Sequence, residues 1–170
     1  MITEELDTPI GRMVTAATSA GICFLNFSDK VTDFPIPDED KNDVAQRHIL
    51  TLKQELKEYF ESGRKEFSVA LDIFGTGFCT MVWKELLKVP YGTTTTYIQQ
   101  ANSLKIPKSV RAVAKANALN RIVILIPCHR IIGSNGKLTG YSGGIDRKRW
   151  LLLHEKKYSL PIDNELFDIT

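Results

Sequence analysis

The chain has 170 residues, of which 43% are hydrophobic and 25% are charged. These proportions are typical of a globular protein, and no apolar run reaches the roughly 20 residues that a membrane-spanning helix needs. Residues 1–75 hold 8 Lys and Arg against 14 Asp and Glu, whereas residues 76–170 hold 14 against 6. The split predicts that the second half meets a polyanion such as nucleic acid, although a solvated surface with uneven charge has the same composition.

The start of the chain and its cysteines bear on where the protein works. The segment Met1–Asp7 is acidic and lacks an apolar core, so we expect no signal peptide. Three cysteines, an odd number, argue against a disulfide framework and favour a reducing compartment. We therefore predict a cytoplasmic protein, or a nuclear one in a eukaryote, without contact to a membrane.

Residues 1–75 predict a small N-terminal α/β domain in which no catalytic set of residues occurs. Turn residues between two apolar runs indicate a hairpin, and an Asp-rich and Pro-rich stretch indicates a loop. The expected elements are a hairpin over residues 10–28, a loop over 29–43, a helix from Asp43 to about Ser62 and a strand over 67–73. We expect this domain to serve packing.

Residues 76–170 predict a mostly helical C-terminal domain, which begins after Gly75. We expect helices over about 78–87, 107–119 and 145–157, and a short helix that Thr94 or Thr95 caps and that ends near residue 101. A buried strand is expected over 122–125 and a turn at 134–137. The two helices before residue 119 are short and closely connected, which is typical of a helix-turn-helix. Lys108, Arg111 and Lys115 follow one another at spacings of three and four, so they share one face of the second helix.

The run Ile126-Pro127-Cys128-His129-Arg130 combines the residues best suited to chemistry. Pro127 cannot continue a central strand, so Cys128 is presented at the end of the predicted strand. Cysteine attacks as the thiolate, and a neighbouring His or Arg favours that form at neutral pH. A single Cys-His pair also occurs around buried structural cysteines, and these five residues alone leave both interpretations open.

Pieces of a longer pattern lie on both sides of Cys128 along the chain. They are Val82-Trp83, Val89-Pro90-Tyr91-Gly92, Thr96-Tyr97, Pro107 to Val113, Asn120, Ile124 to Ile132, Gly140 to Gly144 and His154-Glu155. This set, which spans just under half of the chain, resembles the O6-alkylguanine-DNA alkyltransferase family, the methylated-DNA–protein-cysteine methyltransferases. The resemblance implies an α+β fold, in which a small N-terminal domain packs on a mostly helical domain with a helix-turn-helix and a short strand that leads to the active-site cysteine.

The resemblance also implies a function, which is DNA repair by direct damage reversal. One methyl or alkyl group would move from O6 of guanine, and from O4 of thymine, to the protein's own Cys128 after the damaged base has flipped out of duplex DNA. Each molecule would act once, because a thioether does not exchange with thiols. We expect no cofactor, because alkyl transfer to sulfur requires none. Some members of the family carry a zinc site in the first domain, but no Cys and His ligands for one can be mapped in this sequence, so we expect no metal. We expect a monomer that binds double-stranded DNA containing O6-alkylguanine through the minor groove.

Five residues receive catalytic roles from the resemblance. Cys128 would be the nucleophile, His129 would deprotonate it through a bridging water, and Glu155 would orient the imidazole. Asn120 would hold the turn that carries the active site, and Tyr97 would donate a hydrogen bond to the flipped guanine. Without the resemblance, Glu155 reads as a solvated residue, Tyr97 as a packing residue and Asn120 as a helix C-cap.

The resemblance assigns DNA and base contacts to other positions. Arg111 would fill the gap that the flipped base leaves, although a phosphate contact is an alternative, and Lys108 and Lys115 lie on the same basic face. Tyr141 and Ser142 would form a wall of the base pocket. One departure concerns the turn Leu104-Lys105-Ile106, which lacks the glycine usual in the family, so its conformation can differ.

Three other functions compete with alkyl transfer. A cysteine hydrolase could use Cys128, His129 and Glu155, but it needs an oxyanion hole that the sequence does not identify. A non-catalytic lesion-binding protein of the alkyltransferase-like group would lack the reactive cysteine that this chain has. A helix-turn-helix transcription regulator accounts for the basic helix but not for the Cys-His-Glu set.

Overall fold

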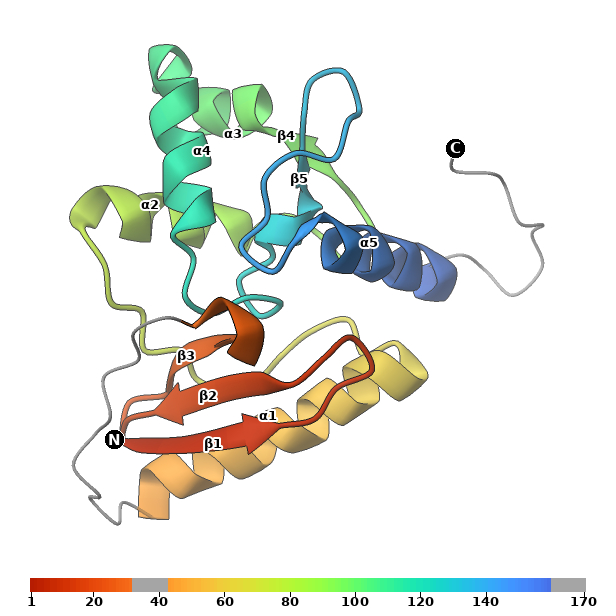
Figure 1. Cartoon of the computed structure of the whole chain (residues 1–170). Coiled ribbons are helices and arrows are strands. Elements are labelled where there is room, and N and C mark those ends of the chain that lie inside the picture. Colours follow the sequence, from red (N-terminus) through yellow and green to blue (C-terminus); the bar gives the residue numbers. More distant parts are fainter. Residues whose placement is uncertain (32–42, 160–170) are drawn as a thin grey trace.

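The computed structural model of the chain describes residues 1–31 and 43–159. A three-stranded sheet with one long helix forms the lower part of the molecule in Figure 1, and the remaining helices lie above it. The predicted α+β class is therefore confirmed. The loop predicted over residues 29–43 falls mostly on residues 32–42, which lie outside the described residues.

The sheet is antiparallel, in the order β1 (Ile2–Leu6), β2 (Met13–Ala17) and β3 (Ile22–Phe27). The helix α1 (Asp43–Ser62) packs on it through side chains that are fully buried, among them Ile49 and Leu52. The predicted hairpin and the predicted helix are confirmed. The strand β1 was not predicted, because Glu4 interrupts its apolar alternation at a position where it pairs with Lys53 of α1.

The outer edge of β3 holds two segments that the sequence analysis predicted as strands. The amide of Ile22 donates to the carbonyl of Ala70 at 2.8 Å, and the amide of Leu25 donates to the carbonyl of Arg121 at 2.8 Å. Each segment makes only one isolated bridge to β3, so the predicted strands over 67–73 and 122–125 are wrong. An apolar run shows that a segment is buried but does not by itself show whether it forms a ladder.

The chain turns sharply within the second of these segments. Ile124 has a φ of 74°, and the amide of Leu125 donates to the carbonyl of Val123 at 3.0 Å. A hydrogen bond between residues two apart around a positive φ is a γ-turn, which is a strained conformation for a β-branched residue. The strand that was expected to lead to Cys128 is therefore replaced by a buried turn, which β3 holds from one side.

The predicted helix-turn-helix is present. It consists of α3 (Tyr97–Ser103), a turn, the 3₁₀ helix η2 (Pro107–Ser109) and α4 (Val110–Ala118). Both α3 and α4 pack on α2 (Gly77–Leu86). Side chains join these helices: Nε1 of Trp83 donates to the carbonyl of Ala116 at 2.8 Å, and Nδ2 of Asn117 donates to Oε1 of Gln100 at 2.7 Å. The cap of α3 is Thr96, which forms a capping box with Gln99, and not Thr94 or Thr95 as predicted.

The turn between α3 and α4 keeps a left-handed residue although it has no glycine. Lys105 has a φ of 60°, which an L-residue adopts at a cost and glycine adopts freely. We expect Lys105→Gly to raise the free energy of unfolding by about 1 kcal/mol, since it relieves this strain. Urea denaturation measures the free energy of unfolding. The control Lys84→Gly, at an exposed position of α2, should lower that free energy by about 1 kcal/mol. Equal destabilisation by both variants would contradict strain at Lys105.

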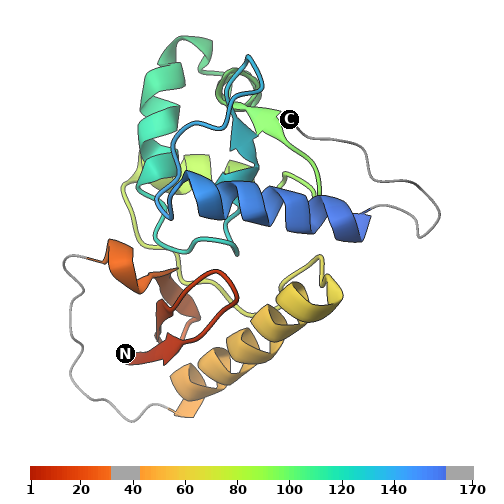
Figure 2. The same cartoon turned by 45° about the vertical axis from the view of Figure 1, so that its right-hand side comes forward.

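The rest of the chain returns across the interface between the two parts. The 3₁₀ helix η3 (Cys128–Arg130) leads into β5 (Ile131–Ile132), which pairs in parallel with β4 (Thr95–Thr96) directly before α3. Figure 2 shows α5 (Ile145–Ser159) crossing between the upper helices and the sheet layer, with its end near the end of α1. No helix within residues 1–31 and 43–159 is long and apolar enough to cross a membrane.

Candidate active site

Cys128 lies at the start of η3 and is only 4% exposed. The Nδ2 group of Asn120 donates to Sγ of Cys128 at 3.1 Å and to the carbonyl of Ile126 at 2.8 Å. The Oδ1 atom of Asn120 accepts from the amide of Ile122 at 3.0 Å. One amide side chain therefore bridges the turn before the cysteine and also supplies a hydrogen bond that favours the thiolate.

His129, the residue after the cysteine, meets Glu155, although the two lie 26 positions apart in the chain. Both side chains are fully buried, and Nε2 of His129 lies 2.7 Å from Oε1 of Glu155. Since a carboxylate only accepts, Nε2 carries the proton and Nδ1 is the free acceptor. Nδ1 is buried and has no hydrogen-bond partner among the residues that the structure describes.

Arg130 neutralises the charge of Glu155. Its Nε donates to Oε2 at 2.9 Å and its Nη2 to Oε1 at 3.0 Å, while Nη1 donates to the carbonyl of Val89 at 2.6 Å. The amide of Gly92 donates to Oε2 at 3.0 Å and the hydroxyl of Tyr59 to Oε1 at 2.9 Å. Burial acts to raise the pKa of Glu155, but the hydrogen bonds and charges of His129 and Arg130 outweigh it and hold this pKa well below its ordinary value.

The thiol itself is protonated at neutral pH in this arrangement. Burial raises the pKa of Cys128 to about 11, against the opposing effects of the Asn120 hydrogen bond and the Lys148 charge. Burial also lowers the pKa of His129, although Glu155 opposes this shift, so the imidazole is neutral at neutral pH. A neutral base next to a protonated nucleophile is the pair that general-base catalysis requires.

Lys148, on α5, is fully buried and was not predicted as a site residue. Its Nζ donates to the carbonyl of Thr139 at 2.8 Å and to that of Gly140 at 3.1 Å. Burial lowers the pKa of Lys148 to about 8, and a charge on Cys128 acts in the other direction. Lys148 therefore anchors the loop after β5 and brings a positive charge toward the sulfur.

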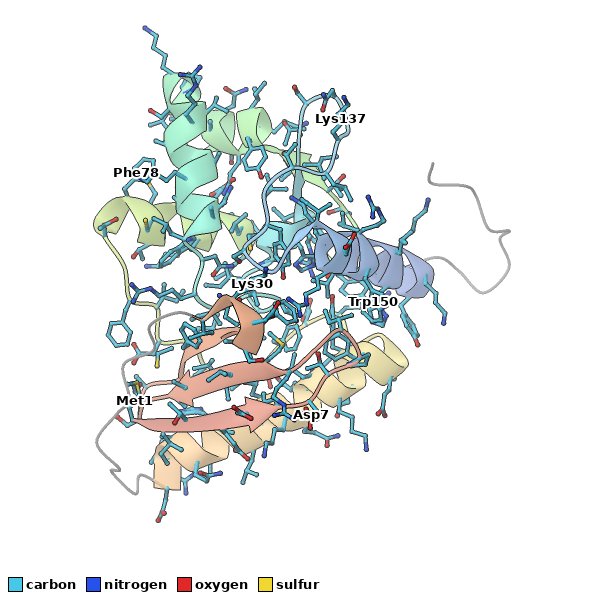
Figure 3. All side chains as sticks on the ribbon, viewed as in Figure 1. Met1, Asp7, Lys30, Phe78, Lys137 and Trp150 are labelled. Atoms are coloured by element: carbon cyan, nitrogen blue, oxygen red, sulfur yellow. The ribbon has the colours of Figure 1, made fainter. Side chains whose placement is uncertain are left out.

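The residues predicted to contact the base lie around this same loop. The hydroxyl of Tyr97 donates to the carbonyl of Thr139 at 3.1 Å, and the ring of Tyr141 stands edge-on to that of His129 at 6.4 Å between centroids. The hydroxyl of Tyr141 and Oγ of Ser142 are buried without a partner in the described part of the chain. Buried polar atoms are rarely left unpaired, so these two atoms are candidates to bind a polar ligand. Figure 3 labels Lys137 on the outermost part of this loop.

The predicted DNA-binding residues lie apart from this cluster. Lys108 is on η2, and Arg111 and Lys115 are on α4; all three side chains are exposed. None of them forms an ion pair with another residue of the described ranges 1–31 and 43–159. Unpaired cations on a helix face are available for phosphate groups.

The sequence did not point to two residues of the site, Lys148 and Tyr59, or to the charge-neutralising role of Arg130. Arg130 was visible in the motif, but its carboxylate partner lies 25 residues away. Tyr59 and Lys148 lie on helices whose apolar pattern marks them as packing positions or as ordinary surface charges. No local signal in the sequence could have identified them.

The chain matches a known family over most of its length. The family described as 6-O-methylguanine DNA methyltransferase matches through its ribonuclease-like domain over residues 1–73 and its DNA binding domain over residues 77–157. The methylated-DNA–protein-cysteine methyltransferase of Mycobacterium tuberculosis is 51% identical over 114 residues, which cover 67% of this chain and 68% of the relative. That of Mycolicibacterium paratuberculosis is 37% identical over 163 residues, 96% of each chain.

Solved structures agree with these matches. A crystal structure of Mycobacterium tuberculosis OGT in complex with DNA superimposes with a TM-score of 0.81 at 39% identity, covering 92% of this chain and 93% of that one. The family match and the structural match thus both cover the part of the chain that carries Cys128. The chain belongs to the 6-O-methylguanine DNA methyltransferase family.

Proposed function

We propose that Cys128 is the residue that receives the alkyl group. Membership of the family makes the protein a DNA-repair methyltransferase, which removes alkyl groups from DNA by transfer to a cysteine of its own. The observation that carries the assignment is the environment of Cys128, where Asn120 donates to the sulfur and the next residue, His129, pairs with the buried Glu155. Cys23 and Cys79 are buried, and residues 1–31 and 43–159 place no comparable His–Glu pair beside either of them.

The proposed reaction begins with the removal of the thiol proton. Nδ1 of His129 accepts this proton through a bridging water, and Glu155 stabilises the imidazolium that forms. The thiolate attacks the alkyl carbon on O6 of guanine, a C–S bond forms, and the C–O bond breaks with its electron pair going to O6. The proton that left the thiol finally returns to the purine, so the products are a thioether and guanine.

The damaged base must reach a sulfur that is almost fully buried. We propose that it flips out of the duplex and enters between Tyr97 and the loop that carries Tyr141 and Ser142. The hydroxyl of Tyr97, which donates to the carbonyl of Thr139 in the structure, then donates to the leaving purine. The unpaired polar atoms of Tyr141 and Ser142 support their place in the pocket wall. Thymine alkylated on O4 is the second substrate that we propose.

We propose that η2 and α4 contact the DNA. The exposed Lys108 and Lys115 would contact phosphates, and Arg111 would fill the space of the flipped base from the minor groove. The protein would bind as a monomer and act once per molecule. Residues 1–75, which are acidic overall, would pack against the site. Residues 76–170, which are basic overall, would bind DNA and carry out the transfer.

Intact-protein mass spectrometry tests the proposed acceptor. After incubation with duplex DNA that carries one O6-methylguanine, we expect one added methyl group per protein molecule, stable and located on the Cys128 peptide. An adduct lost with turnover would favour a cysteine hydrolase. Unchanged mass with the DNA bound would favour a lesion-binding protein or a regulator.

Arg111→Ala tests the proposed role of α4. We expect the rate of transfer from duplex DNA to fall more than the rate of reaction with free O6-methylguanine, because only the duplex needs its gap filled. The matched variant Lys115→Ala should weaken DNA binding and lower the salt dependence by about one counterion, since it removes one phosphate contact. An equal loss of both reactions in Arg111→Ala would contradict the gap-filling role.

A further inference from the structure

Tyr59 links the N-terminal helix α1 directly to the predicted catalytic carboxylate. The residue is fully buried and is held by two consecutive residues of α5. Nε2 of His154 lies 2.6 Å from the carbonyl oxygen of Tyr59, and the hydroxyl of Tyr59 donates to Oε1 of Glu155 at 2.9 Å. His154 in turn stacks on Trp150, which Figure 3 shows on α5 above the sheet layer. Both the backbone and the hydroxyl of Tyr59 are thus fixed relative to α5.

The oxygen that Tyr59 contacts is the one that faces the imidazole. Oε1 of Glu155 also lies 2.7 Å from Nε2 of His129 and accepts from Nη2 of Arg130 at 3.0 Å. The other oxygen is held by Arg130 and by the amide of Gly92. Among the residues that the structure describes, Tyr59 is the one donor to this carboxylate that comes from residues 1–75.

We propose that Tyr59 is a positioning residue for alkyl transfer, whose hydroxyl fixes Oε1 of Glu155 and thereby sets the orientation and the basicity of His129. This inference rests on the proposed transfer to Cys128. It assigns residues 1–75 an indirect part in the reaction, through Glu155 and His129, in addition to packing.

The effect on basicity has a definite sign. The groups that face Glu155 are Tyr59 from α1, Tyr91 and Gly92 from the segment before β4, and His129 and Arg130 from η3. His129 also faces the charge of Lys148 and the ring of Tyr141. A donor on Oε1 withdraws negative charge from the atom that holds Nε2–H. Without the hydroxyl, Glu155 stabilises the imidazolium more strongly, and the pKa of His129 rises.

Single-turnover kinetics of Tyr59→Phe test the proposal. With duplex DNA carrying O6-methylguanine, we expect the maximal rate to fall about tenfold, since the base is less well oriented. The acid limb of the pH–rate profile should move to higher pH, because His129 must be neutral to act as a base. The DNA concentration that gives half of the maximal rate should not change, because Tyr59 is buried away from α4.

Tyr158→Phe is the matched control. The hydroxyl of Tyr158, on α5, donates to the carbonyl of Glu61, on α1, at 3.0 Å. It thus also joins the two helices, but its hydrogen bond is not to Glu155. If Tyr59 acts only through packing between α1 and α5, both variants should lose thermal stability, and neither should move the pH profile.

A second variant keeps the packing of the ring. The more acidic hydroxyl of 3-fluorotyrosine at position 59 is a stronger donor to Oε1, so the acid limb should move to lower pH, opposite to Tyr59→Phe. If the wild-type protein becomes methylated on Cys128 and neither change at position 59 moves the profile, this inference is wrong and the proposed function stands. If the wild-type protein is not methylated at all, it is the proposed function that fails.

Discussion

Cys128→Ser is expected to abolish alkyl transfer and to leave the binding of duplex DNA intact. Serine keeps the shape of the side chain and can accept the hydrogen bond that Asn120 gives to the sulfur. Its hydroxyl is a far weaker nucleophile, because His129 would have to remove a proton from a much weaker acid than a thiol. The basic side chains of η2 and α4 are separate from the cysteine, so DNA affinity should persist.

The experiment combines mass spectrometry with a binding titration on the same O6-methylguanine duplex. Cys79→Ser is the matched control, since Cys79 is also a buried free cysteine of the C-terminal half and has no His–Glu pair beside it in the described part of the chain. It should be methylated at the wild-type rate. Methylation of the Cys128→Ser protein at Cys23 or Cys79 would show that the acceptor has been assigned to the wrong residue.

Glu155→Gln is expected to reduce both the reaction and the stability of the protein. The change leaves Arg130, which is 7% exposed, without a negative partner, and breaking a buried ion pair costs about 3–5 kcal/mol. The transfer rate should fall by at least about a hundredfold, because His129 loses the negative charge that stabilises its protonated form. The side chain of glutamine can also present its NH2 group, so it no longer fixes the tautomer of His129. Chemical denaturation and single-turnover kinetics measure the two effects.

The difference in the free energy of unfolding between the wild type and Glu155→Gln should decrease as the pH is lowered. Because the pKa of Glu155 is lowered in the folded state, its ionised form contributes stability that is complete above its unfolded pKa of about 4.3 and is lost as the pH falls below that value. The difference should therefore be largest at neutral pH and should shrink below about pH 4. The exposed-site control Glu61→Gln should show no such dependence. A difference that stays constant down to acid pH would contradict a buried ionised carboxylate.

Most of the helices could be predicted from the sequence, because an apolar face and the residues at the two ends of a helix lie close together in the chain. Helix α1 has an apolar face, an acidic first residue and Gly63 directly after its end, and it was predicted with both ends in place. The same kind of pattern located α2, α4 and α5 to within a few residues. It failed at Ile124, because a continuous apolar run is equally compatible with a strand and with the buried γ-turn that the chain adopts.

The sequence by itself determined the α+β class, the hairpin, the helix-turn-helix and the motif around Cys128, since these depend on residues close together in the chain. It also indicated Glu155, but only through a resemblance, because His129 and Glu155 lie 26 positions apart and no local pattern predicts their contact. Only the tertiary structure decided that Arg130 neutralises Glu155, that Lys148 is buried near the sulfur and that Tyr59 reaches the carboxylate from the other half of the molecule. The reason is that burial and charge pairing are properties of the packed chain. Tyr59 and Glu155, which lie 96 positions apart, meet only when α1 and α5 pack together.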